Sequence, residues 1–81
     1  MPERNLTLYT GEHCHLCDQA RQLIYQVISG TDWRLREVNI DCDAVLRERY
    51  GCLIPVVSTS AGIEKGWPFT AGQLQRMLTG Q

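Results

Sequence analysis

The sequence lacks any concentration of charge of one sign, and this absence bears on the partners that the chain can bind. Eight Lys and Arg residues stand against nine Asp and Glu residues, for a formal net charge of −1. Phosphate backbones attract proteins through clustered Lys and Arg side chains. No stretch of the sequence offers such a cluster, so the composition argues against a nucleic-acid partner.

Long apolar runs are also absent. A helix that crosses a bilayer needs ~20 predominantly apolar residues, and every apolar stretch in this chain is far shorter. The opening segment, residues 1–5, is polar and lacks the apolar core of a secretory signal peptide. We therefore expect a cytoplasmic protein without a membrane partner.

With 81 residues the chain is too short for two ordinary domains, because one domain usually takes roughly 50 to 200 residues. We therefore treat residues 1–81 as a single domain and expect it to act as a monomer. A core of this size leaves few residues for large insertions. Any active site must then be built on the scaffold itself.

The hydrophobic pattern predicts alternating strands and helices in the first half of the chain. Residues Asn5–Thr10 alternate polar and apolar side chains, as in a strand. Apolar residues recur at three- and four-residue spacing from His15 to Ser29, which predicts a helix. Residues 33–40 alternate again as a second strand, with one slip near Glu37 that a β-bulge could explain. The apolar positions of the helix are Leu16, Ala20, Leu23, Ile24, Val27 and Ile28.

The second half continues with a short helix, a hairpin and a last helix. Asp41 or Asp43 can cap the short helix, which carries its apolar residues between positions 44 and 50. Residues 54–59 and 63–66 predict two strands joined by a tight turn, and Thr70 can cap the last helix.

The predicted element order is therefore β-α-β-α-β-β-α. The first two strands are separated by a helix of crossover length, which implies a parallel pair, whereas the tight turn makes the last two strands antiparallel. The fold class is α/β, with a mixed four-stranded sheet and flanking helices.

The segment Cys14-His15-Leu16-Cys17 lies where the first strand passes into the first helix. A helix N-terminus offers unpaired N–H groups and the positive end of the helix dipole, and both lower the pKa of a thiol. Cys14 is therefore the candidate nucleophile. Cys17 follows by almost one helical turn, so that its sulfur can return to Cys14 and resolve a mixed disulfide. We expect Cys17 to be the more buried thiol.

His13 and His15 flank Cys14, and two interpretations of them stay open. Protonated imidazoles would depress the pKa of the Cys14 thiol further, against the opposing charge of Glu12. Alternatively, both side chains point into solvent and have no effect.

Ile54 and Pro55 open the third predicted strand, where a proline fits only at a strand start or an edge. Ile54-Pro55-Val56-Val57, together with the strand-to-CxxC segment at residues 8–17, resembles the thioredoxin/glutaredoxin superfamily and in particular its small glutaredoxin-like members. The resemblance extends over essentially the whole chain, in element order and in the roughly forty-residue gap between CxxC and proline. It implies a thioredoxin fold in which the Ile54–Pro55 peptide bond is cis and lies beside the CxxC. It also implies that the backbone of Ile54 pairs with a substrate polypeptide.

The sequence departs from typical glutaredoxins where that family holds glutathione. Typical glutaredoxins have a CPYC-like centre, and this chain has CHLC. They have a lysine shortly before the centre, where this chain has Glu12 and His13. They have a later Gly-Gly followed by acidic residues, in place of which this chain has residues 65–70. We therefore expect no bound cofactor, and glutathione enters only as a reductant. Trp67 and Phe69 are expected to seal the last helix onto the sheet.

The resemblance implies a thiol–disulfide oxidoreductase that exchanges disulfides through Cys14 and Cys17. Its substrate would be a disulfide-containing protein or a small thiol, and its electron donor a reductase or glutathione. No metal is required by this mechanism, and we expect Cys42 and Cys52 to be small, mostly inert fillers, since free cysteines are often buried.

Three alternatives stay open. Cys14 and Cys17 could bind a metal together with Cys42, Cys52 or a histidine, although Cys42 and Cys52 form no second close-set pair. The chain could instead be a thioredoxin-fold adaptor that keeps its cysteines without turnover. An iron–sulfur carrier is a third alternative, although its usual single-cysteine CGFS-type site is not evident.

Overall fold

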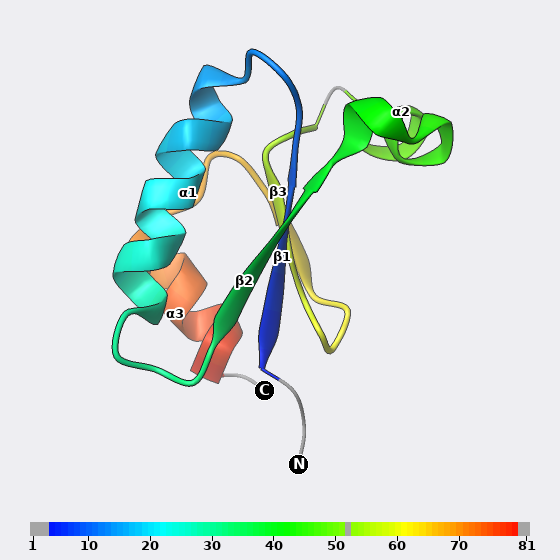
Figure 1. Cartoon of the computed structure of the whole chain (residues 1–81). Helices are drawn as coiled ribbons and strands as arrows, with labels where there is room; N and C mark the ends of the chain where they lie inside the picture. The colour runs from blue at the N-terminus through cyan, green and yellow to red at the C-terminus, as the bar shows by residue number, and fades with distance from the viewer. Residues whose placement is uncertain (1–3, 52, 80–81) are drawn as a thin grey trace.

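The computed structural model describes residues 4–51 and 53–79 and confirms the predicted order of elements. Within these residues, four strands form one sheet in the order β2-β1-β3-β4 (Figure 1). β1 and β2 are parallel, and β3 is antiparallel to both β1 and β4, so the mixed sheet is also confirmed. The elements are β1 (Asn5–Thr10), α1 (His15–Ile28), β2 (Arg34–Asn39), the 3₁₀ turn η1 (Ile40–Cys42), α2 (Ala44–Tyr50), β3 (Val56–Thr59), β4 (Glu64–Gly66) and α3 (Ala71–Thr79).

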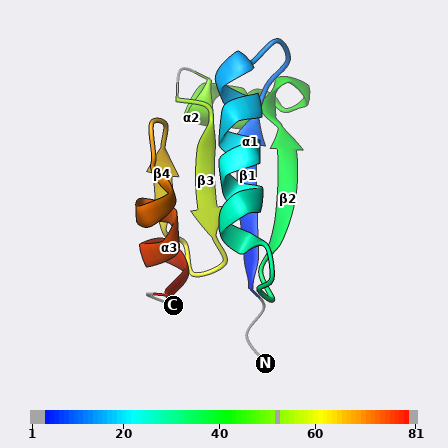
Figure 2. The same cartoon turned by 90° about the vertical axis from the view of Figure 1, so that its left-hand side faces the viewer.

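The helices lie on both faces of the sheet. α1 and α3 cover one face, and α2 lies on the other face near the ends of β1 and β2 (Figures 1 and 2). Trp67 and Phe69 pack edge to face in the main core, as expected, with ring centroids 5.1 Å apart. A smaller cluster under α2 contains Ile40, Tyr50 and Val56. The main core is made of Leu6, Leu8, Ala20, Ile24, Ile28, Trp33, Val57, Phe69, Leu74 and Met77.

The bulge that the slip near Glu37 suggested is wrong. The pairing of β1 with β2 is unbroken from Asn5 opposite Arg34 to Thr10 opposite Asn39. The alternation slips because the strand changes the face that it buries. Trp33 and Leu35 contact the main core, whereas Ile40, directly after the strand, lies in the cluster under α2.

The ends of the helices follow from local capping. Asp43, not Asp41, caps α2 by accepting hydrogen bonds from the N–H groups of Val45 and Leu46. Thr70 caps α3 in a reciprocal arrangement, since its hydroxyl accepts from Gln73 N–H while the Gln73 side chain accepts from Thr70 N–H.

α1 buries one face against the sheet. It is 14 residues long, shorter than the ~20 residues of a membrane span, and no helix in the described part of the chain is both long and apolar enough to cross a bilayer. Leu16, the first apolar position of the helical pattern, is 43% exposed. It lies in the first turn of α1, within the CxxC, and not on the buried face of the helix.

Candidate functional site

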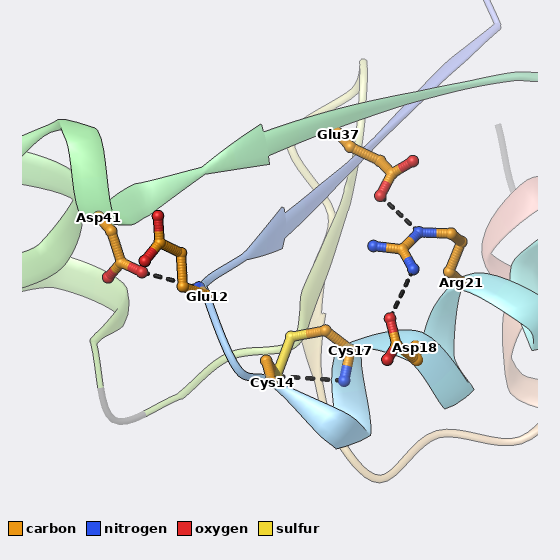
Figure 3. The surroundings of a disulfide bond; sticks show 7 residues. All are labelled: Glu12, Cys14, Cys17, Asp18, Arg21, Glu37 and Asp41. Carbon is orange, nitrogen blue, oxygen red and sulfur yellow. Dashed lines mark hydrogen bonds and ion pairs between the residues drawn. A yellow bond between two sulfur atoms is a disulfide. The ribbon is translucent and has the colours of Figure 1, made fainter.

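Cys14 and Cys17 form a disulfide at the start of α1, with their Cα atoms 5.2 Å apart (Figure 3). Cys14 is the N-cap of the helix, and its Sγ accepts a hydrogen bond of 3.1 Å from the N–H of Cys17. Cys17 is 1% exposed, whereas Cys14 is only partly buried, as predicted for a nucleophile and its resolving partner. The less buried cysteine is thus the one whose sulfur the helix N-terminus contacts.

A short turn delivers Cys14 to this position. Residues 11–14 belong to neither a strand nor a helix, because β1 ends at Thr10 and α1 begins at His15. His13 has a φ of 56°, a left-handed conformation that is uncommon for residues other than glycine. The residue directly before the candidate nucleophile therefore has a strained backbone that its surroundings must hold in place.

A depression of about 390 Å³ lies beside Cys14. Asp18 and Arg21 line it, together with His13 and His15, which are both exposed. This open surface gives a substrate sulfur access to Cys14. The full lining is Thr10, Gly11, His13, Cys14, His15, Asp18 and Arg21.

Arg21 is held by two carboxylates. Its Nε lies 2.6 Å from Glu37 Oε1 on β2, and its Nη1 lies 2.7 Å from Asp18 Oδ1 (Figure 3). The hydrogen bond with Glu37, followed by that with Asp18, raises the pKa of Arg21 above its ordinary value. The guanidinium thus joins α1 to β2 beside the site.

The segment at Ile54 and Pro55 lies at the same end of the sheet as the CxxC. In the antiparallel register Tyr9 pairs with Val56, so the residues after β1 and those before β3 leave the sheet together. The Ile54–Pro55 bond is cis, and Pro55 is buried. A Cβ placed on Gly11 would lie 2.8 Å from Ile54 Cδ1. The turn of residues 11–14, here called the CxxC turn, therefore lies against Ile54.

The backbone around Ile54 is partly occupied. Ile54 N–H donates to the carbonyl of Tyr50 at 3.1 Å, and Trp67 N–H donates to the carbonyl of Pro55 at 3.0 Å. The resemblance predicts that the Ile54 backbone pairs with a substrate. The N–H of Ile54 already donates to Tyr50, so the prediction applies to the carbonyl of Ile54, which would accept a hydrogen bond from the substrate.

One contact of the site was not predicted from the sequence. From the sequence, Asp41 is only a candidate cap of the short helix. Asp41 Oδ2 accepts a 2.7 Å hydrogen bond from the N–H of Glu12, in the turn before Cys14 (Figure 3). The two residues are 29 positions apart, the same offset as in every β1–β2 pair. A known register would therefore have pointed to this contact.

The expectation that Cys42 is a buried filler is wrong, because the side chain is exposed on η1. Cys52 lies outside the described residues. Within residues 4–51 and 53–79, no three His, Cys, Asp or Glu side chains gather as they would around a metal ion.

Comparison with known proteins gives a family match and several similar structures. Residues 5–79 match the glutaredoxin-like domain family (DUF836). The X-ray structure of the structural genomics target XcR50 from X. campestris is 41% identical, with a TM-score of 0.83 over 94% of this chain and 97% of that one. The solution structure of Ne2328 from Nitrosomonas europaea is 22% identical, with a TM-score of 0.80 over 96% and 94% of the two chains. No curated protein matches. The predicted thioredoxin-like fold is thereby confirmed.

Proposed function

The chain belongs to the family of glutaredoxin-like domains, and from that premise we propose that it is a thiol–disulfide oxidoreductase working through Cys14 and Cys17. The family and the CxxC pair together fit a redox-type role. The observation that carries the finer proposal is the position of Cys14, whose partly exposed sulfur caps α1 and accepts the N–H of Cys17.

In the reduced protein this position favours a Cys14 thiolate. The N–H of Cys17 and the positive end of the α1 dipole both stabilise negative charge on Cys14 Sγ. Cysteines in such settings have pKa values lowered from about 8.5 to roughly 3.5–7.5. Cys17 is buried against the sheet and lacks this access to a substrate. We therefore assign the attack to Cys14 and the resolving step to Cys17.

The reaction proceeds by two exchanges. The Cys14 thiolate attacks one sulfur of a substrate disulfide, forms a mixed disulfide and releases the other substrate sulfur as a thiolate that takes up a proton. The thiol of Cys17 then loses its proton and attacks Cys14 Sγ, which expels the second substrate thiolate. Two electrons pass from the protein to the substrate, and the Cys14–Cys17 disulfide is left. Two glutathione molecules, which become glutathione disulfide, or the dithiol of a reductase, which becomes a disulfide, return it to the reduced form.

The substrate is placed against the Ile54–Pro55 segment. A disulfide-bearing polypeptide laid along this segment would accept no hydrogen bond from Ile54 N–H, which already donates to Tyr50. It would instead donate its own N–H to the Ile54 carbonyl. We propose that the reaction takes place in the cytoplasm, where disulfides are kept reduced and a glutathione pool is present.

The proposal is tested by equilibrating the purified, metal-checked protein in glutathione buffers of graded potential and alkylating the free thiols. Mass spectrometry of the peptides then reports Cys14 and Cys17 separately. A reversible two-electron couple between them is expected. Cys14→Ser should abolish exchange, and Cys17→Ser should accumulate the mixed disulfide. Cys42→Ser removes an exposed thiol outside the site and is the matched control, with exchange unchanged.

The same experiment separates the alternatives. Exchange that survives in Cys14→Ser would refute the assignment of the nucleophile. Stoichiometric zinc in the purified protein, with no reversible couple, would favour a metal module. Partner binding that is unaffected by Cys14→Ser, in a protein that exchanges no disulfide, would favour an adaptor.

A further inference from the structure

We propose that Asp41 is a positioning residue, which holds the turn before Cys14 so that the nucleophile stays at the N-terminus of α1. This inference rests on the proposed function. Asp41 would affect the reactivity of Cys14 Sγ through the backbone of the turn, without taking part in the reaction itself. The evidence comes from three features around the turn.

The first feature is the turn itself. Its backbone follows no strand or helix between Thr10 and His15, and His13 holds a left-handed φ of 56°. Such a backbone conformation persists only when its surroundings enforce it. The 2.7 Å hydrogen bond from Glu12 N–H to Asp41 Oδ2 ties the residue just before His13 to η1, which directly follows the neighbouring strand β2. The bond is charge-assisted, which strengthens it, although both residues are exposed to solvent.

The second feature is the rigidity of Asp41. Its own N–H donates to Asn39 Oδ1 at 2.8 Å, which fixes the start of η1 directly after β2. β2 in turn pairs with β1 along its whole length. The acceptor is therefore supported by the sheet rather than by a free loop, as a positioning group requires.

The third feature is the packing around Gly11. A Cβ on this residue would lie 2.8 Å from Ile54 Cδ1 and 3.3 Å from Asp41 Oδ2, so Gly11 lies close to both side chains. Asp41 and Ile54 also line one depression of about 540 Å³ on the α2 side. The carboxylate thus contacts the CxxC turn at the place where that turn meets the Ile54 segment.

Two effects of Asp41 on Cys14 have opposite signs, and this permits a decisive test. Holding the sulfur at the helix N-terminus lowers the pKa of Cys14, whereas a nearby negative charge raises it. Asp41→Ala removes both the acceptor and the charge. Asp41→Asn removes the charge and keeps an oxygen that can accept from Glu12 N–H. The charged and titratable groups near Cys14 that stay unchanged in both variants are Glu12, His13, His15, the reduced thiol of Cys17, Asp18, Arg21 and Glu37.

The experiment measures the rate of Cys14 alkylation by iodoacetamide as a function of pH in the fully reduced protein, with the modified peptide identified by mass. We expect Asp41→Ala to raise the pKa of Cys14 by about one unit toward the ordinary thiol value. At a pH well below the pKa of Cys14 in both proteins, the alkylation rate should fall about threefold, because a higher-pKa thiolate is intrinsically more reactive and offsets part of the tenfold loss of thiolate. Asp41→Asn should leave the pKa unchanged or lower it.

The matched control is Asp43→Ala. Asp43 is exposed, carries the same charge two residues away and caps α2, so its loss costs stability without touching the turn. It should leave the pH profile of Cys14 unchanged. An equal shift in Asp43→Ala and Asp41→Ala would show a general loss of stability and overturn the proposal. A lowered pKa of Cys14 in both Asp41 variants would overturn the proposal in favour of a charge effect. An unchanged pKa of Cys14 in Asp41→Ala would refute it.

Asp41→Glu keeps the comparison possible if Asp41→Ala does not fold. The longer side chain preserves the charge and displaces the acceptor, so a rise in the pKa of Cys14 is again expected and an unchanged pKa refutes the proposal. Alkylation needs no disulfide substrate. A wild-type protein without a reversible Cys14–Cys17 couple would therefore disprove the proposed function, while the Asp41 comparison would still give its own answer.

Discussion

Replacing Tyr50 with phenylalanine should make the stability of the protein less sensitive to alkaline pH. Tyr50 is 4% exposed at the end of α2, stacks on Tyr9 with ring centroids 4.3 Å apart, and donates its hydroxyl proton to Glu64 on β4. The hydrogen bond to Glu64, together with burial of the ring, raises the pKa of Tyr50 from 10.0 to about 12. Tyr50→Phe keeps the stacking and removes the hydrogen bond.

The size of the effect follows from these contacts. A hydrogen bond to a charged group contributes roughly 1.5–3 kcal/mol, but the Glu64 side chain is 35% exposed and regains water in the variant. We therefore expect Tyr50→Phe to cost about 1 kcal/mol near neutral pH. The pKa shift from 10.0 to about 12 corresponds to an upper bound of about 2.7 kcal/mol, which solvent at Glu64 reduces to roughly 1–2 kcal/mol.

The sign follows from the direction of the shift. Because the folded-state pKa is raised, the wild type has this stability in full below pH 10.0 and loses it as the pH rises to about 12. Urea unfolding of both proteins at about pH 8 and about pH 11 should show their difference in unfolding free energy shrinking at the higher pH. Titrating groups that do not interact with Tyr50 cancel in the difference. An equal difference at both values would refute the reasoning.

Three further substitutions test the packing around the site. Gly11→Ala should cost about 1–2 kcal/mol in urea unfolding, because its Cβ would lie 2.8 Å from Ile54 Cδ1; unchanged stability would contradict the close approach. Arg21→Ala should cost less than about 1 kcal/mol, since its pair with Glu37 is partly exposed. That cost should largely vanish in ~1 M salt, and a salt-independent cost would point to packing instead. Thr70→Ala should lower the melting temperature by about 4–8 °C through loss of about 1 kcal/mol of capping, whereas Thr70→Ser should restore it.

Much of the fold could be predicted because its local signals agree with its packing. The alternation over residues 5–10 and the helical spacing after residue 15 each correspond to one buried face. The tight turn before β4 and the cap at Thr70 are local in sequence and need no tertiary information. These elements form as predicted because local preference and core burial favour the same structure.

β2 shows where the pattern stops being sufficient. A strand with one buried face alternates regularly, but this strand is covered by α1 at its start and approaches α2 at its end. Glu37 faces the α1 side and bonds to Arg21, so a charged residue occupies a position that the pattern reserves for an apolar one. The sequence cannot distinguish this arrangement from a bulge, because both produce the same break in alternation.

The candidate site divides in the same way. The two cysteines could be found from their spacing and from the strand-to-helix junction, which are local features. Leu16 and Cys42 could not be placed, since their exposure depends on what the rest of the chain leaves uncovered. Pro55 was singled out because the resemblance to the thioredoxin/glutaredoxin superfamily implies a cis-proline there, at a strand start where a proline fits.

Asp41 marks the limit of what the sequence can predict about this site. Its contact with Glu12 follows from a β1–β2 offset of 29 residues, and a shift of one residue would turn every side chain of β2 to the other face. Burial of the apolar side chains of β2 on the core face therefore requires an odd offset. The offset of 29 meets this requirement, because it pairs Leu6 with Leu35 on the core face. Shifts of two residues satisfy it equally well, because they keep each side chain on its face. Only the register in three dimensions brings a carboxylate beside the CxxC turn, which is why this residue had to be found in the structure.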